Sequence, residues 1–126
     1  MTVLYAEDDI DDFDFFCEIL KSVSPDSHCL NTRDGAETIN FLENATLLPD
    51  IIFMDINMPA MDGKACLRNI KSDSHFKFIP VVVYTTSKNK LDQEHCLQLG
   101  AVAYEQKPNN VKEAIEKISR LIALGT

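Results

Sequence analysis

Carboxylates follow two short apolar segments of the chain, at the point where each segment ends. Asp55 comes directly after Ile51–Met54, and Glu7 and Asp8 come directly after Thr2–Ala6. A short, continuous apolar run is typical of a strand that is covered on both faces of a parallel sheet. A carboxylate behind such a strand lies at the carboxyl edge, where open α/β folds bind ligands. Asp55 taken alone fits a turn cap equally well, because Asp is common in turns.

Two more polar side chains end later apolar segments. Thr85 follows the β-branched run Ile79–Tyr84, and Lys107 lies shortly after Ala101–Tyr104. If all of these segments are parallel strands, their polar ends converge on one edge. Three carboxylates within contact distance repel one another unless a cation lies between them, and ligands that are all oxygen select Mg²⁺ or Mn²⁺ rather than zinc. A lysine and a hydroxyl beside such a metal suit a phosphoryl group.

Helical patterns alternate with these strands and with a weaker strand candidate at His28–Thr32. The first helix is predicted from Ile10, with an inner face made of Ile10, Phe13, Phe16, Cys17, Leu20 and Val23. The next three are predicted behind an N-cap at Asp34, around Cys66–Ile70 and over Lys90–Leu99, and Asn109 is expected to cap the last helix, which has an apolar stripe from Val111 to Ile122. Five alternations with short connections predict a doubly wound parallel sheet with helices on both faces.

Length and composition predict one domain over residues 1–126 of ordinary globular character, with 45% hydrophobic and 25% charged residues. The net charge of −8 argues against a nucleic-acid or anionic-membrane surface. No long apolar run or leader pattern is visible, so a cytoplasmic protein is expected. The four cysteines lie within apolar patterns without a C-x-x-C pair, which predicts buried thiols in a reducing compartment.

The ordered motifs resemble those of response-regulator receiver domains, from Thr2 to about Leu124. The matching features are Glu7-Asp8, the segment Asp55-x-Asn57-Met58-Pro59-x-Met61-Asp62-Gly63, Thr85, and Lys107-Pro108. This resemblance implies a flavodoxin-like (βα)5 fold with five parallel strands in order 2-1-3-4-5 and five helices. It also implies a signalling module of a two-component system that catalyses only its own phosphorylation and dephosphorylation.

The resemblance further implies a role for each matching residue. Asp55 would accept a phosphoryl group from a histidine kinase or phosphotransfer protein, with Lys107 and Thr85 completing the catalytic set. Asp8, Asp55 and the backbone carbonyl of Asn57 would bind Mg²⁺ (or Mn²⁺) directly, and Glu7 would bind it through water.

Family resemblance also implies how the signal leaves the site. Thr85 would move inward after phosphorylation, Tyr104 would then change rotamer, and a downstream protein effector would bind the altered surface. The Lys107-Pro108 bond is expected to be cis. No output domain follows Leu124, so a stand-alone regulator, an excised domain and a middle member of a phosphorelay all stay open. One departure from the family pattern is Tyr84, which is expected to crowd the outer edge of the fourth strand.

Three other functions fit the motifs less well. A haloacid-dehalogenase phosphatase needs a second Asp two residues after the nucleophile, where this chain has Asn57. A flavodoxin-like phosphate loop should be rich in Ser, Thr and Gly, whereas Glu7-Asp8-Asp9 would repel a phosphate. A pseudo-receiver would be expected to lack Asp55 or the acidic pair, and both are present.

Overall fold

Five strands and five helices alternate along the chain in the computed structural model, which describes all residues 1–126. The strands are β1 (Thr2–Ala6), β2 (His28–Thr32), β3 (Ile51–Met54), β4 (Val81–Thr85) and β5 (Ala103–Gln106). The helices are α1 (Ile10–Val23), α2 (Gly35–Asn44), α3 (Gly63–Ser72), α4 (Lys90–Gln98) and α5 (Val111–Ile122), followed by a 3₁₀ turn at Ala123–Gly125. All strands are parallel, in the order β2-β1-β3-β4-β5. The predicted fold class and strand order are confirmed.

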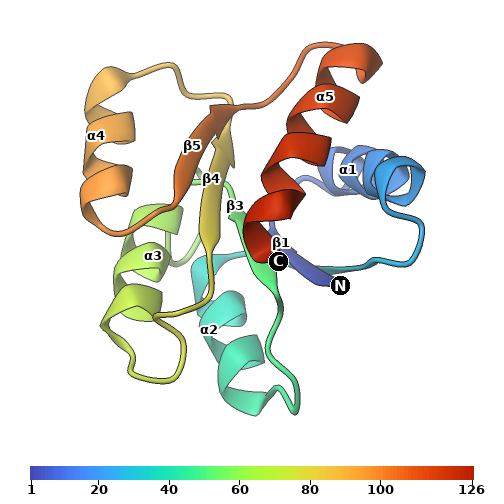
Figure 1. Cartoon of the computed structure of the whole chain (residues 1–126). Helices are drawn as coiled ribbons and strands as arrows, with labels where there is room; N and C mark the ends of the chain where they lie inside the picture. Colours follow the sequence, from blue (N-terminus) through green and yellow to red (C-terminus); the bar gives the residue numbers. More distant parts are fainter.

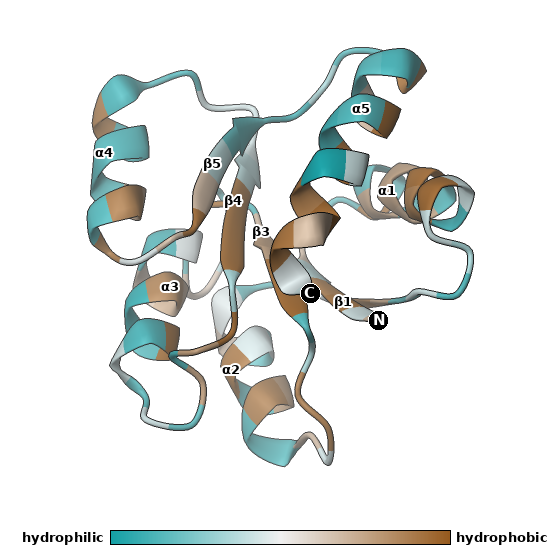
Figure 2. Cartoon of the chain, in the orientation of Figure 1, coloured by the Kyte–Doolittle hydropathy of each residue, from teal (hydrophilic) through white to brown (hydrophobic).

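Helices cover both faces of the sheet, as Figure 1 shows. Helices α1 and α5 lie on one face, and α2, α3 and α4 lie on the other. Each face has its own apolar core, because alternate residues of the buried strands point to opposite sides. Strands β1, β3 and β4 are mostly hydrophobic, β5 ends in hydrophilic residues, and the helices carry both hydrophobic and hydrophilic stripes (Figure 2). No helix is both long and apolar enough to cross a membrane.

Every helix begins at a side-chain cap. Asp9, Asp34, Asp62, Asn89 and Asn110 each accept a hydrogen bond from a backbone N–H of the first helical turn. These caps determine where the chain turns away from the carboxyl edge of the sheet. Two of these caps lie next to candidate site residues in the sequence. Asp9 directly follows Glu7-Asp8, and Asp62 directly follows the Asn57–Met61 loop.

Some predicted element ends and faces were wrong by a few residues. Asn110, not Asn109, caps α5, because its side-chain oxygen accepts the Glu113 N–H at 2.8 Å. Strand β5 begins two residues later than predicted, since the Ala101 N–H still bonds to the end of α4. Gly100 closes α4 with a φ of +111°, as expected of a residue after a helix end.

The inner faces of the terminal helices are narrower than their periodicity predicted. Ile10 and Val111, the first residues of α1 and α5, are exposed. Cys66 and Cys96 are buried thiols as predicted, whereas Cys17 and Cys29 are only half-buried.

The expectation that Tyr84 crowds the outer edge of β4 was wrong. Tyr84 is 4% exposed and points into the core beneath α1 and α5. Its ring makes edge contacts with Tyr5, Phe16 and Phe53, at centroid distances between 5.6 and 5.9 Å. Neighbouring residues of a strand face opposite sides, so Tyr84 packs away from Thr85 instead of beside it. Aromatic pairs of this kind stabilise a core by roughly 0.5–1.5 kcal/mol beyond simple burial.

Candidate functional site

Four of the predicted site residues meet at the carboxyl edge of the sheet. Glu7 follows β1, Asp55 follows β3, Thr85 ends β4 and Lys107 follows β5. Asp55 is 6% exposed and Glu7 is 2% exposed, so two carboxylates are nearly buried side by side. The parallel order of β1, β3 and β4 brings them together, because the chain enters each strand from the opposite end of the sheet.

Lys107 is the only cation in direct contact with these carboxylates. Its ammonium nitrogen lies 3.1 Å from Asp55 Oδ2, 3.0 Å from Glu7 Oε2 and 2.9 Å from Asp12 Oδ2. Burial alone would lower the pKa of Lys107, but the bond to Asp12 and the charge of Asp55 raise the pKa above its ordinary value. The lysine is therefore charged at any physiological pH.

The other oxygen of Asp55 is held by neutral donors. Thr85 donates its hydroxyl to Asp55 Oδ1 at 2.8 Å, and the Asn57 backbone N–H donates to the same oxygen at 3.1 Å. Burial would raise the pKa of Asp55, but the Asn57 N–H and the Lys107 charge outweigh burial and hold the pKa below its ordinary value. Asp55 is thus an oriented, ionised carboxylate, which is the state that a nucleophile requires.

Glu7 behaves in the opposite way. Its burial and the neighbouring Asp55 carboxylate raise the pKa of Glu7 to about 7, against a partial lowering by Lys107. One ammonium shared among three carboxylates leaves the edge with excess negative charge. Glu7, the most deeply buried of the three acids, therefore binds a proton more readily than an ordinary glutamate.

The donor chemistry of this edge fits a hard divalent cation. The carboxylates of Glu7, Asp8 and Asp55 and the carbonyl of Asn57 supply only oxygen, and their raised charge density would be relieved by Mg²⁺ or Mn²⁺. No three acidic side chains are placed so that they could hold a metal ion together, and Asp8 is exposed, with no side-chain hydrogen bond or ion pair. Asn57 likewise exposes its side chain, so its contribution to the site is its backbone.

The segment that follows Asp55 is pinned by close packing. A side-chain carbon at Gly63 would overlap the carbonyl of Asp55 and the Cα of Ile56, and the Gly63 N–H bonds to the Ile56 carbonyl at 3.1 Å. Gly35, at the start of α2, is equally close to the carbonyl of Met61. Only glycine permits these backbone approaches, so the Asn57–Met61 loop is clamped between α2 and α3.

A second network, missed by sequence reasoning, joins the site to α3 and α4. Asp92 of α4 accepts the Ser87 hydroxyl at 2.8 Å and pairs with Lys64 of α3 at 2.6 Å. Tyr104, predicted as a switch residue, is half-buried and donates its hydroxyl to the Ser87 carbonyl at 3.0 Å. Tyr104 therefore contacts the loop after β4 and not the acidic cluster. No residue spacing in the sequence predicts the Lys64–Asp92 pair.

Two further expectations about the site need correction. All peptide bonds are trans, including Lys107-Pro108, in keeping with the general preference of X-Pro bonds for trans. Thr85 already points inward, because its hydroxyl bonds to Asp55 without a phosphoryl group. The residue that the sequence analysis missed most plainly is Asp12, because no local spacing indicates its bond to Lys107.

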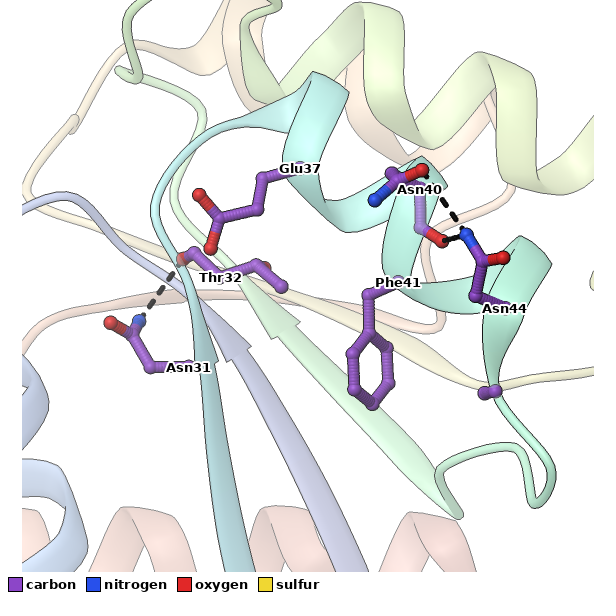
Figure 3. Close-up of a pocket in the computed structure, with 7 residues that line it drawn as sticks. Asn31, Thr32, Glu37, Asn40, Phe41 and Asn44 are labelled. Carbon is purple, nitrogen blue, oxygen red and sulfur yellow. Dashed lines mark hydrogen bonds between the residues drawn. The ribbon is translucent and has the colours of Figure 1, made fainter.

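A separate pocket of about 310 Å³ lies between β2 and α2 (Figure 3), and none of the predicted site residues lines it. Asn31 on its wall donates to the backbone carbonyls of Tyr5, Glu7 and Thr32. This side chain ties the end of β1 to the edge strand and so supports the backbone of Glu7. Its role is structural.

Fold and site together define a doubly wound α/β domain whose acidic carboxyl edge holds one buried, lysine-paired aspartate. The chain belongs to the response regulator receiver domain family of two-component systems, which it matches over residues 3–119. Domains of this family are signalling modules.

Named relatives agree with this assignment. The chain is 32% identical to response regulator Rcp1 of Synechocystis sp. over 121 residues, covering 92% of this chain and 82% of Rcp1. It is 30% identical to the polar-differentiation response regulator DivK of Brucella anthropi, covering 93% and 92% of the two chains.

Solved structures are similar over nearly the whole chain. The phosphorylated cyanobacterial phytochrome response regulator RcpA superposes with a TM-score of 0.88 at 30% identity, over 95% of this chain and 89% of that one. The Mn²⁺-bound form of Rcp1 gives a TM-score of 0.86 at 31% identity, over 97% and 91% of the two chains. One of these relatives is thus phosphorylated and the other holds a divalent metal.

Proposed function

We propose that this chain is a phosphoacceptor that takes a phosphoryl group on Asp55 from the phosphohistidine of a histidine kinase or phosphotransfer protein. The observation that carries the proposal is the divided environment of Asp55, with Lys107 on Oδ2 and the Thr85 hydroxyl and Asn57 N–H on Oδ1. A carboxylate oxygen would form the new P–O bond as the P–N bond breaks. The electron pair of the broken bond would stay on the imidazole nitrogen, which then takes a proton.

The acidic edge would hold Mg²⁺, or Mn²⁺ in its place. Asp8, Asp55 and the Asn57 carbonyl would contact the ion, and Glu7 would reach it through water. When bound, the metal supplies positive charge that offsets the anionic phosphate of the donor. Lys107 supplies the second positive charge, and the Thr85 and Asn57 donors orient the carboxylate that attacks.

Phosphorylation would alter a surface that a downstream protein effector recognises. The network from Thr85 through Ser87 to Asp92 gives the site a direct route to the start of α4. Exposed apolar side chains lie on α4, on the loop before β5 and on α5, at Leu91, Leu97, Val102, Val111 and Ile115. We infer that this α4–β5–α5 face binds the effector. Residues 1–126 would act as one cytoplasmic receiver domain that also hydrolyses its own acyl phosphate.

Mass spectrometry after incubation with acetyl phosphate and Mg²⁺ tests the proposal. We expect one added phosphoryl group on the wild-type chain and none on Asp55→Asn. EDTA should also abolish the addition. The exposed Asp50→Asn serves as a matched control and should label like the wild type, because Asp50 lies at the opposite end of β3. Equal labelling of Asp55→Asn and wild type would overturn the assignment.

A further inference from the structure

The ammonium group of Lys107 has no hydrogen-bond donor to spare. A lysine ammonium carries three N–H donors, and Lys107 directs them to Glu7, Asp12 and Asp55. A phosphoryl group on Asp55 would bring new oxygens that need a donor. Lys107 must therefore release one of its present partners before it can bond to a phosphoryl oxygen.

The three partners differ in how easily they are released. The side chains of Glu7 and Asp55 are 2% and 8% exposed, whereas the Asp12 side chain is 46% exposed. Releasing Glu7 would leave its nearly buried carboxylate with only the Asp9 N–H, at 3.3 Å, as a donor, which is costly. Asp12 can exchange its bond to Lys107 for bonds to water at little cost.

A small cavity beside the Asp12–Lys107 pair leaves room for this exchange. It measures about 40 Å³ and is lined by Asp12, Lys107, Pro108, the aromatic rings of Phe15, Phe16 and Tyr84, and Tyr5. The buried Tyr5 hydroxyl has no hydrogen-bond partner in the protein. A cavity of this size holds a water molecule when it has polar walls.

We propose that Asp12 is a positioning residue that holds the third N–H of Lys107 in the resting state and is displaced when Asp55 is phosphorylated. The proposal rests on the proposed phosphoacceptor function. Asp12 acts through Lys107 and does not touch the phosphoryl group. Its carboxylate favours the unphosphorylated state, because the pair with Lys107 must break for the reaction to proceed.

Replacing Asp12 by Asn keeps the shape of the side chain and removes its charge. The rate of Asp55 labelling by acetyl phosphate should then rise by about two- to fivefold, which is the range expected from a half-exposed ion pair. Asp12→Glu keeps a carboxylate within reach of Lys107 and should restore the wild-type rate. A purely structural role would not distinguish Asn from Glu in this way.

Asp11→Asn is the matched control, because Asp11 is an exposed neighbour in the same helical turn and has no ion pair with Lys107. Rates are measured at 0.1 M and at about 1 M salt, where long-range effects on an anionic donor are screened. The gain of Asp12→Asn should persist at high salt and exceed that of Asp11→Asn.

Each outcome decides one of the two proposals. If Asp12→Asn labels at the wild-type rate, or no faster than Asp11→Asn, then Asp12 does not hold Lys107 back and the inference is wrong. The same holds if Asp12→Glu labels as fast as Asp12→Asn. If the wild-type chain is not labelled at Asp55 at all, the phosphoacceptor function itself fails.

Discussion

At the scale of single residues, the two buried carboxylates of the site are tuned in opposite directions. Asp55 has a lowered pKa because backbone and lysine donors overcome its burial, while Glu7 has a pKa raised to about 7. The two acids share Lys107 but differ in neutral donors, since Thr85 and Asn57 both donate to Asp55, whereas Glu7 accepts only the longer bond from the Asp9 N–H, at 3.3 Å. Backbone and hydroxyl donors thus favour the ionised form of Asp55 over that of Glu7.

The raised pKa of Glu7 makes stability depend on pH in the metal-free protein. Between the ordinary pKa of 4.5 and the folded value of about 7, the folded chain binds more protons than the unfolded chain. The free energy of unfolding therefore falls as the pH rises through this window. Glu7→Gln should remove that fall and be more stable than the wild type at pH 8, by roughly 1–2 kcal/mol.

Urea unfolding in EDTA at pH 5 and pH 8 measures this effect. The advantage of Glu7→Gln over wild type should be larger at pH 8 than at pH 5. The exposed Glu43→Gln is the control and should show no such change. An advantage that is the same at both pH values would contradict the prediction.

Thr85 is the residue whose position in the structure differs most from the sequence-based expectation. Its buried hydroxyl bonds to the ionised Asp55 before any phosphorylation. Thr85→Ala should therefore lower the free energy of unfolding by about 1–3 kcal/mol, because a buried bond to a charged group is lost. Labelling of Asp55 should persist, because the attacking carboxylate and Lys107 remain.

Thr85→Ser keeps the hydroxyl and is the comparison variant. Urea unfolding and acetyl phosphate labelling on the same preparations separate the structural role from the chemical one. A Thr85→Ala protein as stable as Thr85→Ser would show that the bond to Asp55 contributes nothing to the resting fold. Complete loss of labelling would move Thr85 into the essential chemistry.

At the scale of elements, the site depends on how tightly α3 approaches the end of β3. Gly63 begins α3 with its Cα against the backbone of Asp55 and Ile56. Asp62 caps the helix through the Ala65 N–H at 2.9 Å. The first turn of α3 thereby fixes the backbone of Asp55.

Gly63→Ala should push α3 away from Asp55. Because the new methyl group meets backbone atoms that cannot rotate aside, we expect a loss of about 1–3 kcal/mol in the free energy of unfolding. Gly125→Ala is the matched control, since its nearest neighbour would be the Ile51 side chain at 3.0 Å, and its loss should be smaller. Urea unfolding of both variants checks the order, and equal losses would contradict it.

Elements α3 and α4 are also joined by the Lys64–Asp92 pair beside Ser87. The bond from Lys64 and the bond from the Ser87 hydroxyl lower the pKa of Asp92 below its ordinary value. Both partners are about one-quarter exposed, so the pair itself stabilises the fold only modestly. Its importance is geometric, since it holds the start of α4 against the loop after Thr85.

At the scale of the whole molecule, the net charge is −8, and part of this negative charge lies at the carboxyl edge of the sheet. Of the first eighteen residues, seven are acidic and none is basic. Such an edge attracts divalent cations and repels nucleic acid. Binding of a cation to the folded chain alone stabilises it by mass action.

Mg²⁺ should therefore raise the thermal unfolding midpoint of the wild-type chain by several degrees, corresponding to about 2–3 kcal/mol at 100 times the dissociation constant. Asp8→Ala should lose most of this rise. Without metal, Asp8→Ala should differ from wild type by less than about 0.5 kcal/mol, because Asp8 is exposed and unpaired.

Thermal melts with Mg²⁺ and with EDTA test both statements. Asp11→Ala, an exposed acidic neighbour, is the control and should keep the full response to metal. A wild-type midpoint that is insensitive to Mg²⁺ would contradict metal binding at this edge. A metal response of Asp8→Ala as large as that of wild type would place the ion elsewhere.

The sequence by itself determined the fold and located the candidate site at the carboxyl edge of the sheet. The apolar runs Ile51–Met54 and Ile79–Tyr84 favour covered strands, and parallel strands deliver the residues after them to one edge. Asp55, Glu7 and Lys107 were found for this reason. Hydrophobic periodicity and the ends of apolar runs are local properties of the sequence, so they can be recognised without knowing how the helices pack.

Tertiary structure alone decided which side chains bond to one another. The Asp12–Lys107 pair joins residues 95 apart, and the Lys64–Asp92 pair joins residues 28 apart. Such contacts depend on how α1, α3 and α4 are rotated and seated on the sheet, and no local spacing records that rotation. The inward position of Thr85 also depends on tertiary contacts, because its hydroxyl bonds to Asp55 at the end of the neighbouring strand. The sequence thus indicates which polar residues lie at the carboxyl edge of the sheet, and the packing of the helices determines which donor bonds to which acceptor.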